Sequence, residues 1–187
     1  MTDTPPTRGP ESATTRASSL VLVNTGEGKG KSTAAFGTAI RAVARGWRVA
    51  VIQFLKSGEW KVGEEKIGRQ LGIDWWALGD GFTWDSSDMT ESQAIAREAW
   101  DHAASVIRSG DYDLVILDEV TYPINWGWID LADVISVIDS RPAEVSLILT
   151  GRDAPEAIVE AADTVTEMRN VKHAFDRGIK AKRGIDY

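Results

Sequence analysis

The chain has 187 residues, of which 43% are hydrophobic and 26% are charged. This length predicts one domain with a sizeable core, and the composition is typical of a globular protein. The formal net charge of −7 indicates no broad nucleic-acid-binding surface, although an acidic chain can still bind ATP through a few local donors. Because cysteine is absent, disulfides, thiolate metal sites and a cysteine nucleophile are excluded.

The first 19 residues are rich in proline, threonine and serine, and they predict a flexible N-terminal arm. They lack the apolar stretch of a signal peptide, and no apolar run approaches the roughly 18 residues of a membrane helix. We therefore expect a cytoplasmic protein with no membrane partner and no nucleic-acid partner. Residues 20–187 predict a single domain that ends in a basic tail. The basic residues of the tail are Arg169, Lys172, Arg177, Lys180, Lys182 and Arg183.

After residue 20, apolar runs alternate with segments of helical periodicity, and residues 79–88 predict a loop from their Gly, Asp and Ser content. Strands that alternate with helices predict an α/β fold, in which a mostly parallel central sheet carries helices on both faces. The predicted strands cover residues 20–23, 48–54, 73–78, 113–119, 144–151 and 164–168. The predicted helices cover residues 32–46, 61–72, a segment that begins at Thr90, 129–140 and 154–163.

The segment NTGEGKGKST, residues 24–33, follows the first predicted strand and leads into the first predicted helix, an order that forms an anion site. We expect Lys29 and Lys31 to add positive charge and the Ser32 hydroxyl to bind Mg²⁺. The usual P-loop spacing requires glycine where this chain has Thr25, so a bound triphosphate need not lie in the usual direction. The alternative is a glycine-rich turn with solvated lysines. The predicted nucleotide-binding residues here are Thr25, Gly26, Glu27, Gly28, Lys29, Gly30, Lys31, Ser32 and Thr33.

The apolar run LVIL ends in two acids, Asp118 and Glu119. An acid at a strand end is typical of Mg²⁺ sites beside phosphate loops, so either carboxylate is predicted to hold the metal, directly or through water. The alternative is that these acids only cap a turn. His102 lies near the apolar face of its helix, so we expect a structural histidine whose ring nitrogens are hydrogen-bonded. His173 lies in the tail, so we expect it to be solvated. No nucleophile–base set is evident.

Several blocks of the sequence, in the same order, resemble the P-loop type of ATP:corrinoid adenosyltransferases of the cobalamin pathway, and the resemblance extends from about residue 20 to residue 187. It implies a Rossmann-like P-loop NTPase fold, a homodimer, and transfer of the 5′-deoxyadenosyl group of ATP to the Co(I) of a corrinoid with release of triphosphate. It also implies that ATP lies in the direction opposite to that in most P-loop enzymes, which gives meaning to Thr25. The blocks are TGEGKGKSTAAFGTAIRA, VIQFLKSGEW, GDGFTW, LVILDEVTYPINWGW, LTGRDAPEAIVEAAD and VKHAFDRGIKAKRGIDY.

The resemblance also implies roles for individual residues. Lys31 would neutralise the leaving triphosphate, and Arg41 matches a position that reaches the nucleotide sugar. Phe82 and Trp84 match an aromatic pair that displaces the lower ligand of cobalt and so eases its reduction. Taken alone, two loop aromatics more often pack back onto the core. The implied cofactor is Mg²⁺ or Mn²⁺, the substrates are ATP and reduced corrinoid, and the implied electron donor is a reductase such as a flavoprotein.

Two other classes of function stay open from the sequence. A generic P-loop ATPase or small-molecule kinase would release ADP, whereas adenosyl transfer leaves triphosphate. A non-catalytic carrier of nucleotide or corrinoid would show no turnover. The N-terminal arm either orders over the active site or stays solvated, and the basic tail either closes on triphosphate or corrinoid or stays solvated.

Overall fold

The structure is a computed structural model that describes residues 15–56, 63–79 and 89–186. Its six strands form one sheet in the order β3-β2-β4-β5-β1-β6, and every neighbouring pair is parallel. This arrangement confirms the predicted α/β class and agrees with a Rossmann-like P-loop fold. The strands are β1 (Val21–Thr25), β2 (Val49–Gln53), β3 (Asp74–Ala77), β4 (Leu114–Asp118), β5 (Ser146–Thr150) and β6 (Thr164–Glu167).

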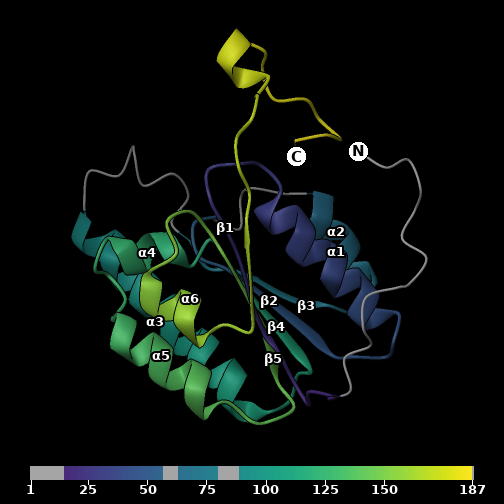
Figure 1. The fold of residues 1–187 in the computed structure, drawn as a ribbon, viewed down its shortest axis with the longest axis vertical. Coiled ribbons are helices and arrows are strands. Elements are labelled where there is room, and N and C mark those ends of the chain that lie inside the picture. Colours follow the sequence, from purple (N-terminus) through teal and green to yellow (C-terminus); the bar gives the residue numbers. More distant parts are fainter. Residues whose placement is uncertain (1–14, 57–62, 80–88, 187) are drawn as a thin grey trace, which may run out of the picture.

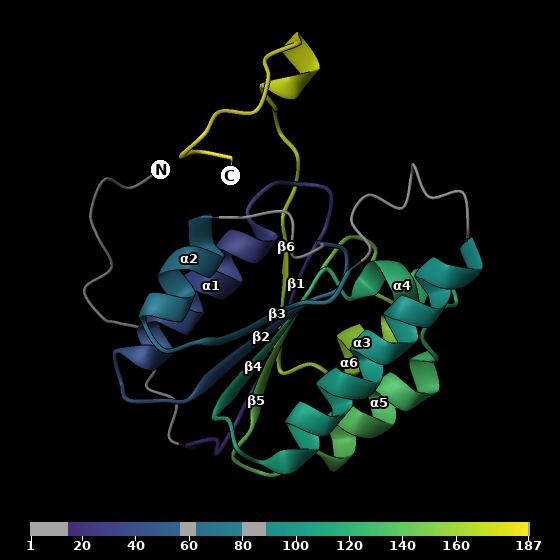
Figure 2. The same cartoon turned by 180° about the vertical axis from the view of Figure 1, so that it is seen from behind.

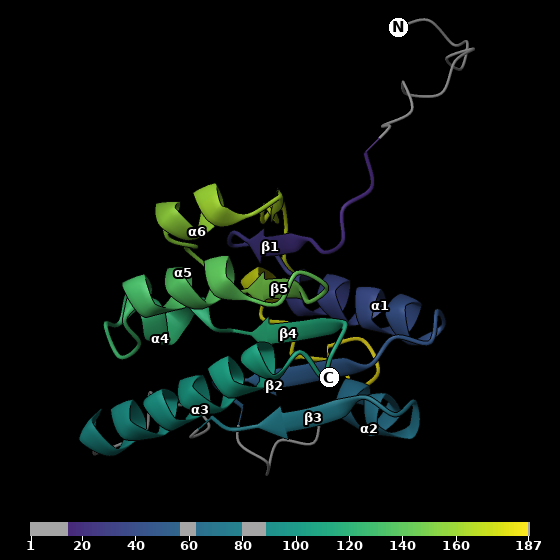
Figure 3. The ribbon, with the colours of Figure 1, turned by 90° about the horizontal axis from the view of Figure 1, so that it is seen from below.

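The helices cover both faces of the sheet. Figures 1 and 2 show α1 and α2 on one face and α3, α4, α5 and α6 on the other, and Figure 3 shows the strands between these two layers. None of the helices in the described ranges combines the length and the apolar character needed to cross a bilayer. The helices are α1 (Lys31–Val43), α2 (Gly63–Gln70), α3 (Met89–Ser109), α4 (Thr121–Asn125), α5 (Leu131–Ser140) and α6 (Glu156–Ala161).

The central strands are buried on both faces, which explains their continuous apolar runs. In β4, successive side chains point to opposite faces of the sheet. Leu114 and Ile116 therefore pack in the core under α1 together with Phe36, whereas Val115 and Leu117 pack in the core under α3 and α5. All five residues of β4 are buried, so the strand shows no polar alternation in the sequence.

Three local features differ from the prediction. β1 extends to Thr25, which we expected in the loop, and α1 ends at Val43, before the predicted end at residue 46. The N–H of Gly46 donates to the Val43 carbonyl and the residue has φ 81°, so the helix closes with a glycine-type cap. The short helix Thr121–Asn125 was not predicted, because five residues without a side-chain cap leave no periodic signal.

The strand register brings the candidate functional residues to one edge of the sheet. Gln53 lies opposite Asp118 across β2 and β4, and Asn24 lies opposite Thr150 across β1 and β5. These residues lie at the carboxyl ends of their strands, where open parallel sheets bind ligands. The C-terminal tail extends from β6 past the same edge (Figure 1).

Candidate active site

The phosphate loop, residues 26–30, connects β1 to α1. The Lys31 ammonium lies within this loop, because its Nζ donates hydrogen bonds to the carbonyl oxygens of Gly26 and Gly28, each at 2.7 Å. Burial, and then the charge of nearby Arg152, lowers the pKa of Lys31. An ammonium group partly withdrawn from water interacts more strongly with an anion than a solvated one does.

The glycines of the phosphate loop are required by the chain that follows β6. The N–H of Gly28 donates to the carbonyl oxygen of Met168. A Cβ on Gly26 would lie 2.7 Å from that oxygen and a Cβ on Gly28 would lie 2.6 Å from it, so either side chain would force the backbone apart. Gly30 has more space, but its φ of 114° favours glycine. We expected these glycines to admit phosphate oxygens, and close packing is a second reason for two of them.

Thr25 has a structural role at the end of β1. Its side-chain Oγ1, which a glycine would lack, accepts a hydrogen bond from the N–H of Ala154 at 3.1 Å, and its backbone carbonyl oxygen accepts one from the N–H of Met168 at 2.8 Å. The residue at the unusual position of the loop therefore ties the segments after β5 and β6 to the end of β1. Its predicted contact with the nucleotide stays a prediction.

A cavity of about 330 Å³ opens beside the phosphate loop. Lys29 and Lys31 reach it from the loop, and Arg152 reaches it from the segment after β5. Lys29 Nζ lies 2.7 Å from Asp186 Oδ1, and Arg152 Nη1 lies 3.1 Å from Glu27 Oε2. Three cations around one polar cavity suit a polyphosphate. The cavity is lined by Glu27, Gly28, Lys29, Lys31, Arg152, Asn170, His173, Phe175 and Asp176.

Sequence reasoning did not identify Arg152 as a site residue, and it left the role of the tail open. The signal for Arg152 was available, because a basic residue two positions after a buried strand lies at the ligand-binding edge. The tail adds Asn170 and His173 to the cavity lining. His173, which we predicted to be solvated, is half-buried, and its Nδ1 accepts a hydrogen bond from the N–H of Phe175 at 3.1 Å.

Helix α1 separates the remaining predicted nucleotide ligands. Ser32 is half-buried in the first turn beside Lys31, and Thr33 is exposed in the same turn. Arg41 is exposed in the last turn, about 15 Å further along the helix axis at 1.5 Å per residue. The structure therefore groups Ser32 with the phosphate loop and places Arg41 apart from it. The contact of Arg41 with the nucleotide sugar stays a prediction.

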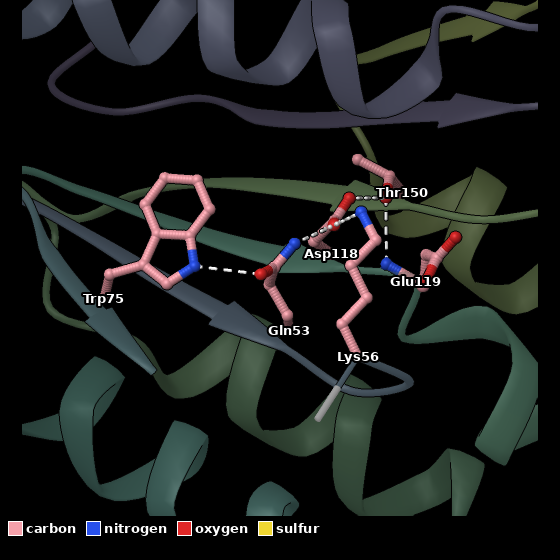
Figure 4. Close-up of polar contacts among 6 residues, drawn as sticks. All are labelled: Gln53, Lys56, Trp75, Asp118, Glu119 and Thr150. Atoms are coloured by element: carbon pink, nitrogen blue, oxygen red, sulfur yellow. Dashed lines mark hydrogen bonds and ion pairs between the residues drawn. The ribbon is translucent and has the colours of Figure 1, made fainter. Parts of the chain in front are cut away.

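Asp118 is fully buried, and protein groups engage both of its carboxylate oxygens (Figure 4). Gln53 Nε2 donates to Oδ2 at 2.8 Å, and Thr150 Oγ1 donates to Oδ1 at 2.8 Å. Lys56 Nζ lies 3.7 Å from Oδ2. A carboxylate held in this way is compensated within the protein, which fits an anchoring role better than a metal-binding one.

Glu119 has the opposite character. Its φ is 63°, and its N–H donates to Thr150 Oγ1 at 2.9 Å, while Figure 4 marks no hydrogen bond or ion pair from its carboxylate to the other five residues drawn. Burial, and then the charge of Asp118, raises the pKa of Glu119, whereas Lys56 and Lys31 oppose this shift. Within the described ranges no three His, Asp or Glu side chains gather at one point, so a metal held by Glu119 would need hydroxyl, water or phosphate oxygens as well.

Two groups of predicted residues remain. Phe82 and Trp84 lie outside the described residues. His102 packs edge-on against Trp76 with ring centroids 4.8 Å apart, as a structural histidine does. Its Nε2 is buried and has no hydrogen-bond partner in the part of the chain that the structure describes, so the expectation of a satisfied side chain was wrong.

Comparison with known proteins agrees with the site. Residues 17–187 match the family model described as ATP:corrinoid adenosyltransferase BtuR/CobO/CobP. A corrinoid adenosyltransferase of Escherichia coli (strain K12) is 45% identical over 168 residues, which cover 90% of this chain and 85% of the relative. The corrinoid adenosyltransferase CobA of Salmonella typhimurium is 43% identical over the same shares of the two chains, and a corrinoid adenosyltransferase of Pseudomonas aeruginosa is 42% identical over 90% of this chain and 83% of its own length. The chain therefore belongs to the ATP:corrinoid adenosyltransferase family.

Proposed function

We propose that this chain transfers the 5′-deoxyadenosyl group of ATP to the Co(I) of a corrinoid and releases triphosphate, in cobalamin biosynthesis or salvage. The observation that carries the proposal for this family member is the cavity beside the phosphate loop, in which Lys29, Lys31 and Arg152 meet. Three cations around one cavity can neutralise a triphosphate, which is the leaving group of this reaction.

The reaction requires little acid–base chemistry from the protein. The electron pair of Co(I) forms the bond to C5′ of the adenosyl group, the bond between C5′ and the triphosphate oxygen breaks, and triphosphate leaves with the electron pair of that bond. Cobalt is oxidised formally to Co(III), and no proton is transferred. The protein therefore has to align cobalt with C5′, neutralise the leaving group and exclude water.

The reversed direction of ATP is what membership of the family implies. In this proposal the loop amides, Lys31 and Arg152 hold the triphosphate as the leaving group, and cobalt attacks C5′ at the ribose end of the nucleotide and not the γ-phosphorus. Arg41, which lies further along α1, would then contact the sugar. The hydroxyl of Thr25 accepts a hydrogen bond from the Ala154 N–H and its carbonyl oxygen accepts one from the Met168 N–H, so this residue would support the nucleotide site by fixing the start of the phosphate loop.

The carboxylate pair fits a divalent cation when its two members have different roles. Glu119 is the candidate ligand because its carboxylate is free of the network in Figure 4, and Ser32 would offer its hydroxyl from the start of α1. Asp118, proposed as an alternative ligand from the sequence, is less suited because both of its oxygens accept hydrogen bonds from protein groups. Bound Mg²⁺ or Mn²⁺ would neutralise further charge on the departing triphosphate.

The remaining parts of the proposal come from the family. Phe82 and Trp84 would fill the space below the corrin ring and keep a lower ligand from cobalt, which eases reduction of Co(II). The enzyme would work as a cytoplasmic homodimer, with electrons supplied by a reductase such as a flavoprotein. Residues 1–19 would either order over the bound substrates or stay solvated.

The proposal is tested by anaerobic incubation of the chain with ATP, Mg²⁺ and chemically reduced corrinoid. We expect the absorption spectrum of a cobalt–carbon bond to develop together with triphosphate. Release of ADP without a cobalt–carbon product would favour a P-loop ATPase or kinase. Tight binding of both substrates without turnover would favour a carrier.

The aromatic pair has its own test. Trp84→Ala and Phe82→Ala are expected to slow the reaction at least tenfold when it starts from Co(II) with a mild reductant, because the lower ligand then stays on cobalt. The same variants should lose much less activity with pre-reduced Co(I). Equal losses in the two assays would refute a role in displacing the lower ligand.

A further inference from the structure

Thr150, the last residue of β5, connects the two carboxylates of the site. It is fully buried. Its Oγ1 donates a hydrogen bond to Asp118 Oδ1 at 2.8 Å and accepts one from the N–H of Glu119 at 2.9 Å (Figure 4). A hydroxyl has one proton to donate and lone pairs to accept, so these two contacts use it in a defined orientation. The side chain of one acid and the backbone of the next are thereby joined through a third residue.

The other side of Asp118 is fixed as well. Trp75 Nε1 donates to Gln53 Oε1 at 2.9 Å, and Gln53 Nε2 donates to Asp118 Oδ2 at 2.8 Å. Because an indole N–H can only donate, it directs the oxygen of the Gln53 amide towards itself and the amide nitrogen towards Asp118. A chain of directional hydrogen bonds therefore runs from Trp75 through Asp118 and Thr150 to the backbone of Glu119.

The backbone of Glu119 needs this support. Its φ of 63° lies in the left-handed region, which is unfavourable for a residue with a side chain. Two residues after Glu119, Thr121 Oγ1 donates to the carbonyl oxygen of Arg152 at 2.6 Å. A Cβ on Gly151 would lie 1.9 Å from that same Oγ1, so the turns after β4 and β5 are in close contact. Glu119 and Arg152 thus lie on two segments that are joined by two hydrogen bonds, from the Glu119 N–H to Thr150 Oγ1 and from Thr121 Oγ1 to the Arg152 carbonyl oxygen.

We propose that Thr150 is a positioning residue of the metal–triphosphate site: its hydroxyl, anchored on the buried Asp118, holds the left-handed backbone of Glu119 and thereby directs the Glu119 carboxylate to the metal ion that the triphosphate also binds. Asp118 then acts through Thr150 and does not ligate the metal. This inference rests on the proposed function only in assigning Glu119 to the metal. Partners of metal ligands commonly change metal affinity by about 10–100-fold when they are removed.

The test is a double-mutant cycle read as Mn²⁺ affinity in the presence of ATP, measured by electron paramagnetic resonance without corrinoid. Thr150→Val removes the hydroxyl and keeps the shape of the side chain, and Thr150→Ser keeps the hydroxyl as the matched control. We expect Thr150→Val to weaken Mn²⁺ binding about tenfold and Thr150→Ser to change it less than about twofold. In the Glu119→Gln background, Thr150→Val should weaken Mn²⁺ binding by less than about a further twofold, because its effect passes through Glu119.

Equal losses from Thr150→Val in both backgrounds would overturn the proposal, as would a Thr150→Ser variant as weak as Thr150→Val. An unchanged Mn²⁺ affinity in Thr150→Val would overturn it as well. If Thr150→Val does not fold, Gln53→Met, which removes the donor to the other oxygen of Asp118, takes its place in the same cycle with the same expected non-additivity. Because corrinoid is absent, a failure of adenosyl transfer does not affect this result, and an additive cycle leaves the proposed transfer activity intact.

Discussion

The phosphate loop and the carboxylate pair lie at the same edge of the sheet, but the protein holds their charges in different ways. The side chain of Lys29 is half-exposed and pairs with Asp186 of the tail, and Arg152 pairs with the exposed Glu27. Asp118, in contrast, is fully buried and bound by Gln53 and Thr150. Exposed ion pairs are weak and can be exchanged for a ligand, whereas a buried hydrogen-bonded charge is costly to disturb. The cations beside the phosphate loop can therefore exchange their carboxylate partners for a ligand, whereas the contacts of Asp118 stay in place.

The largest effect is expected at the loop. Lys31→Ala removes the ammonium that lies within the loop and should lower kcat/KM for ATP by at least about 100-fold, since preorganised charge at a leaving group commonly contributes that much. Lys29→Ala, at an exposed position of the same loop, is the matched control and should cost much less. The rate of cobalt–carbon bond formation at limiting ATP measures both. Near-normal activity of Lys31→Ala would contradict the assigned role of the loop.

The second effect is a difference in protein stability between variants of Asp118 and Glu119. Asp118→Asn should lower the free energy of unfolding by about 2 kcal/mol, because the new amide group faces the donors of Gln53 or Thr150. Glu119→Gln should leave the stability of the ligand-free protein unchanged or slightly higher, because the protein disfavours the charge of Glu119. Urea denaturation measures the difference. The reverse order of stability would make Glu119 the anchor and Asp118 the exchangeable acid.

The third effect is a pH dependence that belongs to Glu119. Burial and the charge of Asp118 raise its pKa in the folded protein, so the folded state holds this proton more tightly than the unfolded chain. The resulting stability is present below the ordinary glutamate pKa and is lost as the pH rises through the raised value. We expect the Tm of the ligand-free wild type to fall relative to that of Glu119→Gln across this interval. Parallel Tm profiles for the two proteins would contradict the raised pKa.

The smallest effect is expected at the tail. Asp186→Asn removes the carboxylate that pairs with Lys29 and should lower the KM for ATP about twofold at low salt, with little effect at high salt. Asp139→Asn, an exposed acid on α5, is the control and should leave the KM unchanged. A raised KM in Asp186→Asn would show that Asp186 assists nucleotide binding and does not compete with it.

Much of this arrangement could be predicted from local sequence. The alternation of strands and helices and the position of the phosphate loop follow from patterns within a few tens of residues, and the structure confirms the fold class. The separate roles proposed for Asp118 and Glu119 could not be predicted, because they depend on the pairing of β2, β4 and β5, which brings Gln53 and Thr150 to one carboxylate.

The contributions of distant segments were missed for the same reason. Met168 approaches Gly26 and Gly28 only because β6 pairs with β1, although these residues are about 140 positions apart in the chain. Arg152 joins the lysines of the loop because β5 pairs with β1 on the other side. A single sequence gives no direct sign of such pairings, so the loop was predicted and most of its surroundings were not.

The most direct test of the central claim, that the loop holds a leaving triphosphate, is phosphorus NMR of a completed reaction with ATP, Mg²⁺ and pre-reduced corrinoid. We predict one equivalent of triphosphate for each cobalt–carbon bond formed, and no equivalent amount of ADP or phosphate. Formation of ADP or phosphate in step with the corrinoid product would place the bond cleavage at a phosphoanhydride and contradict the claim.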